Sequence, residues 1–443
     1  MAEIDAEELR KEILEKIKTY YHAVFEQKKP FRRGDKIHYA GRVFDAGEMT
    51  AAADSVLDFW LTEGRYAAAF EEALKKFSGA PFASLTVSGS AANLLAFMSL
   101  TSPELGVHRI MRGDEVVTVA AGFPTTVAPI VQYGAVPVFI DVDSKTANVN
   151  PDLLEKALSK KTKAVVLAHT LGNPFNVDAV VHFCEQNGLL LLEDNCDALG
   201  SLWNDCPTGT FGHVSTGSFY PAHHITTGEG GVVFAKNPVL AKVVRSLRDW
   251  GRDCSCATGK DNSCGRRFKG QFGELPYGYD HKYVYSRFGY NLKMTEMQAA
   301  IGVKQMEKLS GFIEARRKNF EYLRDRLSEL KEISVFENYE KAKPSWFGCL
   351  MTLTDKAAFS RGELSVYLEK NGIQTRNLFA GNLIRQPCFT ALTKDVDYKV
   401  ASALDQTDIL MNRALWIGVY PALRREELDF MADKIIEFCR LKG

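Results

Sequence analysis

Short apolar segments alternate with helical segments through the middle of the chain, and this alternation limits the possible folds most strongly. Residues 115–120, 136–143 and 189–195 are rich in consecutive apolar side chains, as expected for strands buried on both faces. Helical patterns lie between such segments, at 125–134 and 178–188. The order predicts an α/β protein whose mostly parallel sheet is flanked by helices.

Composition and charge exclude several classes of partner. The chain has 443 residues, of which 46% are hydrophobic, and its 55 basic residues balance its 55 acidic ones. A net charge of zero gives no electrostatic reason to expect nucleic acid or an anionic membrane as partner. The N-terminus lacks the apolar core of a signal peptide, and no apolar run reaches the roughly 20 residues of a membrane span. We therefore expect a cytoplasmic protein with reduced cysteines.

The chain divides into three predicted parts. Residues 1–50 form an N-terminal helical arm, with a helical pattern over 7–29. Residues 51–310 form a large domain, and 311–443 form a smaller C-terminal α/β domain. Within the large domain, 251–286 is rich in Gly, Cys, Arg and Tyr, and an irregular loop of this length is usually functional.

Two features suggest a ligand at the ends of the predicted strands. The turn Ser88–Asn93 (SGSAAN) follows the strand 84–87 and opens a helix, where free backbone N–H groups can hold a phosphate. Asp194 ends an apolar strand, and parallel sheets bind ligands at the carboxyl ends of their strands. A small-residue turn and a helix-capping acid are the simpler interpretations of the same residues.

A third motif gives these features a context. Residues 215–236 read STGSFYPAHHITTGEGGVVFAK, and with the two features above the chain resembles the DegT/DnrJ/EryC1 family of sugar aminotransferases over about residues 50–440. The resemblance implies an aspartate-aminotransferase-like, fold-type I architecture and a pyridoxal or pyridoxamine 5′-phosphate cofactor (PLP or PMP).

The resemblance also implies individual cofactor contacts. The matching positions are Gly89, Ser90, Ala91 and Ser218 at the phosphate, Phe123 over the ring, Asp194 at the pyridine nitrogen, and Asn291 at the phosphate of the neighbouring subunit's cofactor. Asp194 would keep that nitrogen protonated, which makes the ring an electron sink. The role of Asn291 implies a homodimer with shared active sites.

His223 stands where the family carries its Schiff-base lysine, and no lysine occurs between Lys163 and Lys236. Imidazole cannot form that bond, but it can transfer a proton at neutral pH. The cofactor would then act as free PMP through its own amine. Tyr220 and Asp197 are further candidates beside the ring. A non-catalytic, binding member of the fold is the alternative.

Four cysteines have a distinctive spacing. Cys196, Cys254, Cys256 and Cys264 follow the pattern C-x57-C-x-C-x7-C. Four thiolates are the ligand set of a [2Fe–2S] cluster, and zinc also accepts four cysteines. The spacing alone leaves iron–sulfur, zinc and no metal open.

The histidine and the four cysteines together resemble one branch of the family, the CDP-sugar 3-dehydrases of 3,6-dideoxyhexose (O-antigen) biosynthesis. This resemblance implies PMP- and [2Fe–2S]-dependent C-3 dehydration and deoxygenation of CDP-4-keto-6-deoxy-D-glucose. His223 would move the proton, and an NADH-dependent flavin/iron–sulfur reductase would supply electrons. A cluster-free nucleotide-sugar 3-dehydratase, regenerated by glutamate, is the alternative within the family.

Overall fold

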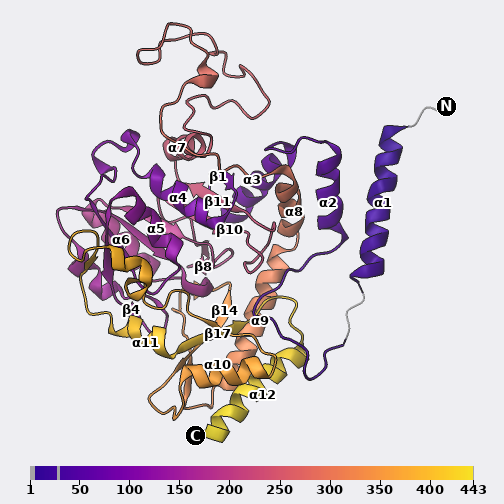
Figure 1. Cartoon of the computed structure of the whole chain (residues 1–443), viewed down its shortest axis with the longest axis vertical. Coiled ribbons are helices and arrows are strands. Elements are labelled where there is room, and N and C mark those ends of the chain that lie inside the picture. Colours follow the sequence, from indigo (N-terminus) through magenta and orange to yellow (C-terminus); the bar gives the residue numbers. More distant parts are fainter. Residues whose placement is uncertain (1–4, 27–29, 443) are drawn as a thin grey trace.

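The central sheet collects strands from most of the chain (Figure 1). The computed structural model describes residues 5–26 and 30–442, and within them an eight-stranded sheet has the order β1-β11-β10-β7-β6-β2-β3-β16. Its strands are β1 (Phe82–Thr86), β2 (Glu115–Val119), β3 (Val136–Ile140), β6 (Thr162–Ala168), β7 (Leu190–Asp194), β10 (Val214–Ser218), β11 (Gly231–Ala235) and β16 (Lys399–Val400). Pairing is parallel from β10 to β16, whereas β11 is antiparallel to both β1 and β10. The predicted mostly parallel α/β sheet is confirmed.

Helices cover both faces of this sheet because successive strand residues point to opposite sides. In β6, Ala164 and Val166 belong to the core under α4 and α7, whereas Val165 and Leu167 belong to the core under α6. The helices of this body are α3 (Arg65–Ser78), α4 (Gly89–Ser99), α5 (Pro124–Tyr133), α6 (Val177–Asn187), α7 (Pro238–Arg248) and α8 (Glu296–Met306). A capping box of Thr295 and Gln298 opens α8.

The C-terminal part forms a second sheet with its own helices (Figure 1). Its antiparallel strands have the order β12 (Ile333–Val335), β14 (Gly348–Leu353), β17 (Ala414–Gly418) and β15 (Arg376–Asn377). The helices are α9 (Leu309–Leu327), α10 (Arg361–Lys370), α11 (Asp405–Arg413) and α12 (Arg425–Lys442). Strand pairing ties this part to the rest of the chain, because β16 joins the large sheet, β13 (Ala342–Lys343) pairs with β8 (Leu202–Trp203), and Ile37 bridges to Ile373.

Short elements complete the description. The two-residue strands are β4 (Val142–Asp143), β5 (Asn148–Val149), β8 (Leu202–Trp203), β9 (Cys206–Pro207) and β13 (Ala342–Lys343). The 3-10 turns are η1 (Pro103–His108), η2 (Pro151–Ala157), η3 (Thr170–Gly172), η4 (His281–Tyr283), η5 (Leu383–Arg385) and η6 (Pro387–Ala391).

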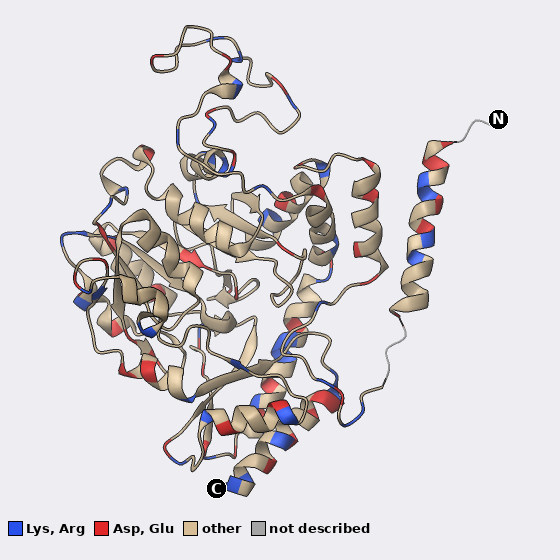
Figure 2. Ribbon diagram, viewed as in Figure 1, with Lys and Arg blue, Asp and Glu red and all other residues tan. Residues whose placement is uncertain are grey.

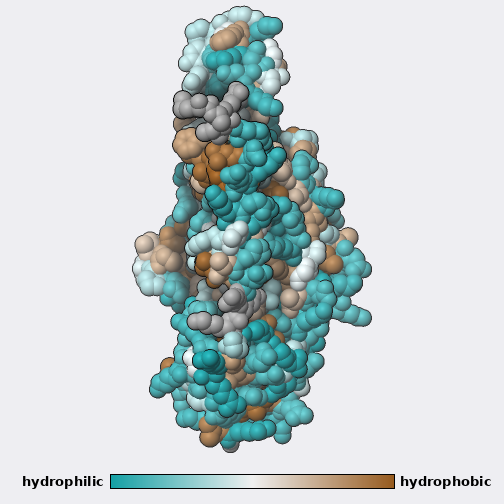
Figure 3. All heavy atoms as spheres, turned by 90° about the vertical axis from the view of Figure 1, so that its right-hand side faces the viewer, coloured by the Kyte–Doolittle hydropathy of each residue, from teal (hydrophilic) through white to brown (hydrophobic). Residues whose placement is uncertain are grey.

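The N-terminal helix α1 (Ala6–Val24) lies along α2 (Ala46–Leu57) at the side of the body (Figure 1). Arg10 joins the two helices through ion pairs with Asp54 and Asp58. Both charge signs alternate along α1 (Figure 2), and the face that it presents outward is mostly hydrophilic (Figure 3). The predicted helix 7–29 is confirmed up to Val24, and its residues 27–29 lie outside the described residues. None of the described helices is long and apolar enough to cross a membrane.

The segment 251–286 extends beyond α7 at one end of the molecule (Figure 1). Its one helical turn is η4, one isolated bridge joins Arg252 to Tyr285, and the rest of its backbone is turns and irregular structure. The predicted irregular, Cys-rich loop is confirmed.

Candidate active site

A cavity of about 630 Å³ opens at the carboxyl ends of β6, β7 and β10. The strand register places Ala168, Asp194 and Thr216 side by side at these ends. A volume of this size is typical of a cofactor or substrate pocket. Of the predicted residues, the cavity lining includes Gly89, Ser90, Phe123, Asp194, Cys196, Asp197, Ser218, Tyr220 and His223.

The N-terminus of α4 forms one wall and presents backbone N–H groups to the cavity. Ser88 caps the helix by accepting a hydrogen bond from the N–H of Ala91 at 3.1 Å, so the predicted Ala91 amide is already used, and Ala91 is not among the cavity-lining residues. A Cβ on Gly89 would lie 2.5 Å from the Cβ of Ser218. Glycine is therefore required where α4 packs against β10, which brings the first amides of the helix and the Ser218 hydroxyl to one anion-binding corner.

Asp194 is 5% exposed and is held by three elements. Its Oδ2 accepts hydrogen bonds from Asn93 Nδ2 at 2.8 Å and Thr126 Oγ1 at 2.6 Å. The N–H of Cys196 donates to Oδ1 at 3.2 Å, and Thr216 Oγ1 donates to Asn93 Oδ1 at 2.7 Å. No ion pair involving Asp194 occurs within the described residues. A buried carboxylate without a cation is costly, so this one is suited to a cationic group of a ligand.

His223 lies in the loop between β10 and β11, with its Nδ1 3.5 Å from Asp197 Oδ1. Burial lowers the pKa of His223 to about 4, although Asp194 acts in the opposite direction. Burial, reinforced by Asp194, raises the pKa of Asp197 to about 8. Both groups are therefore neutral at pH 7, and their contact is not an ion pair. A neutral imidazole can accept a proton, and a neutral carboxyl can donate a hydrogen bond.

The elevated pKa of Asp197 should make the folded protein less stable as the pH rises. The folded state keeps this proton up to about pH 8, whereas an unfolded carboxyl ionises near pH 4. The free-energy cost of keeping Asp197 protonated in the folded state is therefore absent below pH 4 and grows as the pH rises toward 8. Because the side chain is 15% exposed, we expect Asp197→Asn to raise the unfolding free energy of the cofactor-free protein by about 2 kcal/mol at pH 7.

Urea unfolding of the two proteins at pH 4 and pH 7 checks this prediction. The two midpoints should coincide at pH 4 and separate at pH 7, with the variant more stable. A variant that is equally or less stable at pH 7 would contradict the proposed protonation of Asp197.

Aromatic side chains form other parts of the cavity wall. Phe123 is half exposed, and its ring meets the edge of Phe379 at 5.8 Å. Tyr220 is also half exposed. Phe347 packs on the His223 imidazole with a centroid distance of 5.1 Å. Phe347 and Phe379 come from the C-terminal part of the chain, and no local motif in the sequence marks them as cavity residues.

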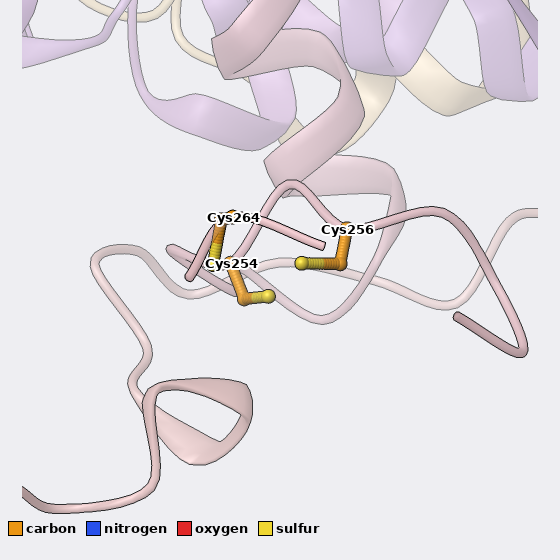
Figure 4. A group of neighbouring side chains, drawn as sticks. All are labelled: Cys254, Cys256 and Cys264. Carbon is orange, nitrogen blue, oxygen red and sulfur yellow. The ribbon is translucent and has the colours of Figure 1, made fainter. Parts of the chain in front are cut away.

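Three of the four predicted cysteine ligands form a group. The Sγ atoms of Cys254, Cys256 and Cys264 lie within 4.8 Å of one another (Figure 4). A hydrogen bond from Ser263 lowers the pKa of Cys256 to about 6, whereas burial raises the pKa of Cys254. A thiol with a lowered pKa is a good metal ligand, because the thiolate is the form that binds.

The fourth predicted ligand is not brought to this group within the described chain. Cys196 lines the cavity of Asp194, with its Sγ 3.7 Å from Thr216 Oγ1, and burial raises its pKa well above the usual value. The three other thiols line a separate pocket. There, His281 Nδ1 lies 4.0 Å from Cys264 Sγ, and its Nε2 lies 2.7 Å from Asp253 Oδ2.

Asn291 is exposed and does not line the cavity of its own chain. It bridges to Asp249, and Lys293 Nζ donates to its Oδ1 at 2.9 Å. Its expected role concerns the cofactor of a neighbouring subunit and stays a prediction.

Comparisons with known proteins agree with this architecture. The sequence model of the DegT/DnrJ/EryC1/StrS aminotransferase family matches residues 44–436. The chain is 49% identical over 435 residues to the lipopolysaccharide biosynthesis protein RfbH of Salmonella typhimurium, covering 98% of each chain. It is 46% identical over 428 residues to the dTDP-4-dehydro-2,6-dideoxy-D-glucose 3-dehydratase of Saccharopolyspora spinosa, covering 96% of this chain and 91% of that protein.

Solved structures show the same fold. The structure of E. coli GDP-4-keto-6-deoxy-D-mannose-3-dehydratase with bound hydrated PLP has a TM-score of 0.81 and 28% identity, covering 90% of this chain and 100% of that one. The Helicobacter pylori aminotransferase PseC, at 22% identity, has a TM-score of 0.78 over 92% of this chain and 100% of that one. The chain thus has the fold-type I α/β architecture, and it belongs to the DegT/DnrJ/EryC1/StrS aminotransferase family.

Proposed function

We propose that the chain is a PMP-dependent nucleotide-sugar 3-dehydratase. The observation that carries the proposal is that one cavity holds a buried carboxylate without a counter-cation, Asp194, together with a histidine at the family's lysine position, His223. No lysine is among the described residues that line this cavity. The 3-dehydratase names of two relatives support the same reaction class.

The cavity fits this cofactor in three respects. The amides of α4 and the Ser218 hydroxyl would hold its phosphate. Asp194 would bind the protonated ring nitrogen, and the exposed face of Phe123 would cover the ring. When bound, PMP supplies an amine that condenses with a ketone and a ring that takes up electrons.

The residues of the chain then have separate tasks. Asp194 holds a proton on the ring nitrogen, because its Oδ2 already accepts two hydrogen bonds and its charge is otherwise unpaired. The neutral His223 imidazole would accept a proton at a ring nitrogen and could return it to the leaving hydroxyl, which would depart as water. Asp197, neutral at pH 7, donates a hydrogen bond beside the ring without adding a second negative charge.

The test is a substrate exchange experiment. Protein prepared without oxygen and loaded with PMP is incubated in H₂¹⁸O with CDP-4-keto-6-deoxy-D-glucose, and with the matching GDP- and dTDP-linked sugars. Reversible loss of the C-3 hydroxyl introduces ¹⁸O at C-3 without any electron donor, and fragmentation in the mass spectrometer distinguishes this label from exchange of the C-4 carbonyl oxygen. We expect exchange with the CDP-linked sugar. Exchange with another nucleotide alone would overturn the CDP assignment, and no exchange with any would overturn the dehydratase.

We further propose that a [2Fe–2S] cluster reduces the dehydrated product with electrons from an NADH-dependent reductase. The grouped thiols of Cys254, Cys256 and Cys264 support this proposal, and four ligands are needed in all. Cys196 would have to come from a second protomer or from a rearranged chain to complete the set. We propose a homodimer with shared active sites, for which the fully exposed Phe288, near Asn291, offers an apolar surface to cover.

Metal analysis tests the cluster. We expect Cys256→Ser to lose most of its iron and acid-labile sulfide while binding PMP normally, because Cys256 does not line the PMP cavity. The exposed cysteine Cys206, on β9, is the control, and Cys206→Ser should keep its iron. Cys196→Ser and His281→Gln, measured in parallel, show which side chain completes the ligand set. Zinc in place of iron in the wild type would contradict the electron-transfer proposal.

One observation favours a second candidate. A solved GDP-4-keto-6-deoxymannose-3-dehydratase with a TM-score of 0.81 contains a trapped PLP-glutamate geminal diamine. A glutamate-regenerated, cluster-free dehydratase would bind PMP, show ¹⁸O exchange, and contain neither iron nor sulfide. Iron analysis therefore separates the two candidates.

A further inference from the structure

Arg316, on α9, is a buried charged side chain that contacts the loop carrying His223. It is 1% exposed, and no carboxylate of the described residues lies within ion-pair distance of it. Its guanidinium donates instead to three backbone carbonyls. Nη2 donates to the carbonyl of His223 at 3.0 Å, and Nη1 donates to those of Trp346 and Phe347 at 3.2 and 3.3 Å.

Burying a guanidinium without a carboxylate partner lowers the stability of the folded state. A contribution to stability therefore does not explain why Arg316 is buried here. Its contacts connect two segments that are far apart in the sequence. One is the loop that carries His223, and the other enters β14 and carries Phe347, whose ring packs on the His223 imidazole. A second bond joins the same segments, because His224 Nε2 lies 2.8 Å from the carbonyl oxygen of Ser345.

Few contacts orient the imidazole ring of His223. Its Nδ1 is buried and has no hydrogen-bond partner within the described structure. The orientation of the imidazole therefore depends on where its backbone lies, on the Phe347 ring beside it, and on Asp197, whose Oδ1 lies 3.5 Å from Nδ1. Arg316 fixes the first two at once, since it binds the carbonyls of His223 and Phe347.

We infer that Arg316 is a positioning residue for His223, which holds the imidazole in place through the backbone of His223 and Phe347. The inference rests on the proposed function for its catalytic consequence, and on geometry alone for its structural one. Misplacing a reacting group by about 1 Å can cost roughly 100-fold in rate, so a residue that never touches the cofactor can still control turnover.

The neighbouring Arg317 provides a matched control. It lies on the same helix and also donates to backbone carbonyls, those of Pro344, Gly200 and Lys343. None of its hydrogen bonds reaches the His223 loop. Loss of Arg317 therefore reproduces the loss of a partly buried arginine from α9 without loosening His223.

The experiment compares Arg316→Met, Arg316→Lys and Arg317→Met in the PMP-loaded protein. We expect Arg316→Met to lower kcat about 100-fold with KM and PMP affinity unchanged. The lysine variant keeps a donor and should recover about tenfold of that loss. On a His223→Asn background, Arg316→Met should change the residual rate less than twofold. Arg317→Met should leave kcat within about threefold.

Hydrogen–deuterium exchange supplies a readout that is independent of activity. Peptides covering 219–227 and 345–348 should exchange faster in Arg316→Met than in the wild type. The 219–227 peptide should be unchanged in Arg317→Met, because no hydrogen bond of Arg317 reaches it. Equal losses of kcat on the two backgrounds, or unchanged exchange in both peptides, would overturn the positioning role. If the peptides loosen but the wild type turns over no nucleotide sugar, the proposed function fails and the structural role stands. If Arg316→Met does not fold, Arg316→Lys provides the same comparison.

Discussion

His223→Asn is expected to lower the rate of dehydration by roughly 10²- to 10⁴-fold, the contribution of a positioned general base. Asparagine is smaller than histidine but places its amide group where the imidazole carries Nδ1, so the loop should survive, and this amide cannot accept a proton at neutral pH. PMP binding should be unchanged, because the phosphate corner and Asp194 are untouched. The direct measurement is the rate at which a methylene proton of bound PMP exchanges with solvent in the presence of the nucleotide sugar.

His224→Gln is the matched control for this variant. His224 is buried next to His223, yet it lines a different pocket and lies against the Ser345 carbonyl. A glutamine amide can donate to the same carbonyl, so we expect turnover within about tenfold of the wild type. This loss is smaller than the loss expected for removing the general base in His223→Asn. If His224→Gln is as inactive as His223→Asn, or if His223→Asn turns over normally, the assignment of the base to His223 fails.

The fold was predictable because the strands of a parallel sheet carry their own signal. Segments such as 189–195 are apolar on both faces and read as strands without any tertiary information. The addition of β16, from the C-terminal part of the chain, to the large sheet was not predictable. Lys399–Val400 is two residues long and has no alternation to read, yet it extends the large sheet beside β3.

The site was predictable where a local motif carries the chemistry. Gly89, Ser218 and His223 lie in short motifs of fixed order, and the cavity brings them together. Arg316 and Phe347 lie in ordinary helical and strand sequence, and only the folded chain places them at His223. The cysteine spacing predicted one group of four, and the structure brings together Cys254, Cys256 and Cys264. Spacing along the chain does not show where each side chain points. Cys196 follows the end of β7 and turns into the cofactor cavity, toward Thr216.

Asp194 offers the second large effect because its hydrogen bonds dictate how an amide would lie. Oδ2 receives the two shorter hydrogen bonds, from Asn93 Nδ2 and Thr126 Oγ1, whereas Oδ1 receives the longer one from the Cys196 N–H. An asparagine at 194 would therefore keep its carbonyl oxygen at Oδ2 and lose the hydrogen bond from Cys196. Its NH₂ group would then replace Oδ1. A donor would face the cavity where the wild type presents a negatively charged acceptor, and a ring nitrogen beside it would lose its proton.

We therefore expect Asp194→Asn to lower kcat by roughly 10²- to 10³-fold, as expected for removing one preorganised electrostatic partner of the reacting group. PMP should still bind through its phosphate, with weaker affinity. A pH titration of the bound PMP absorption should show the ring-nitrogen proton lost at a lower pH than in the wild type. Thr126→Val removes one hydrogen bond but keeps the charge, so it should cost less than tenfold. Thr126→Val keeps the Asp194 carboxylate, whereas Asp194→Asn removes it. Equal losses of kcat in the two variants would therefore mean that Asp194 acts through its hydrogen-bond network and not through its charge.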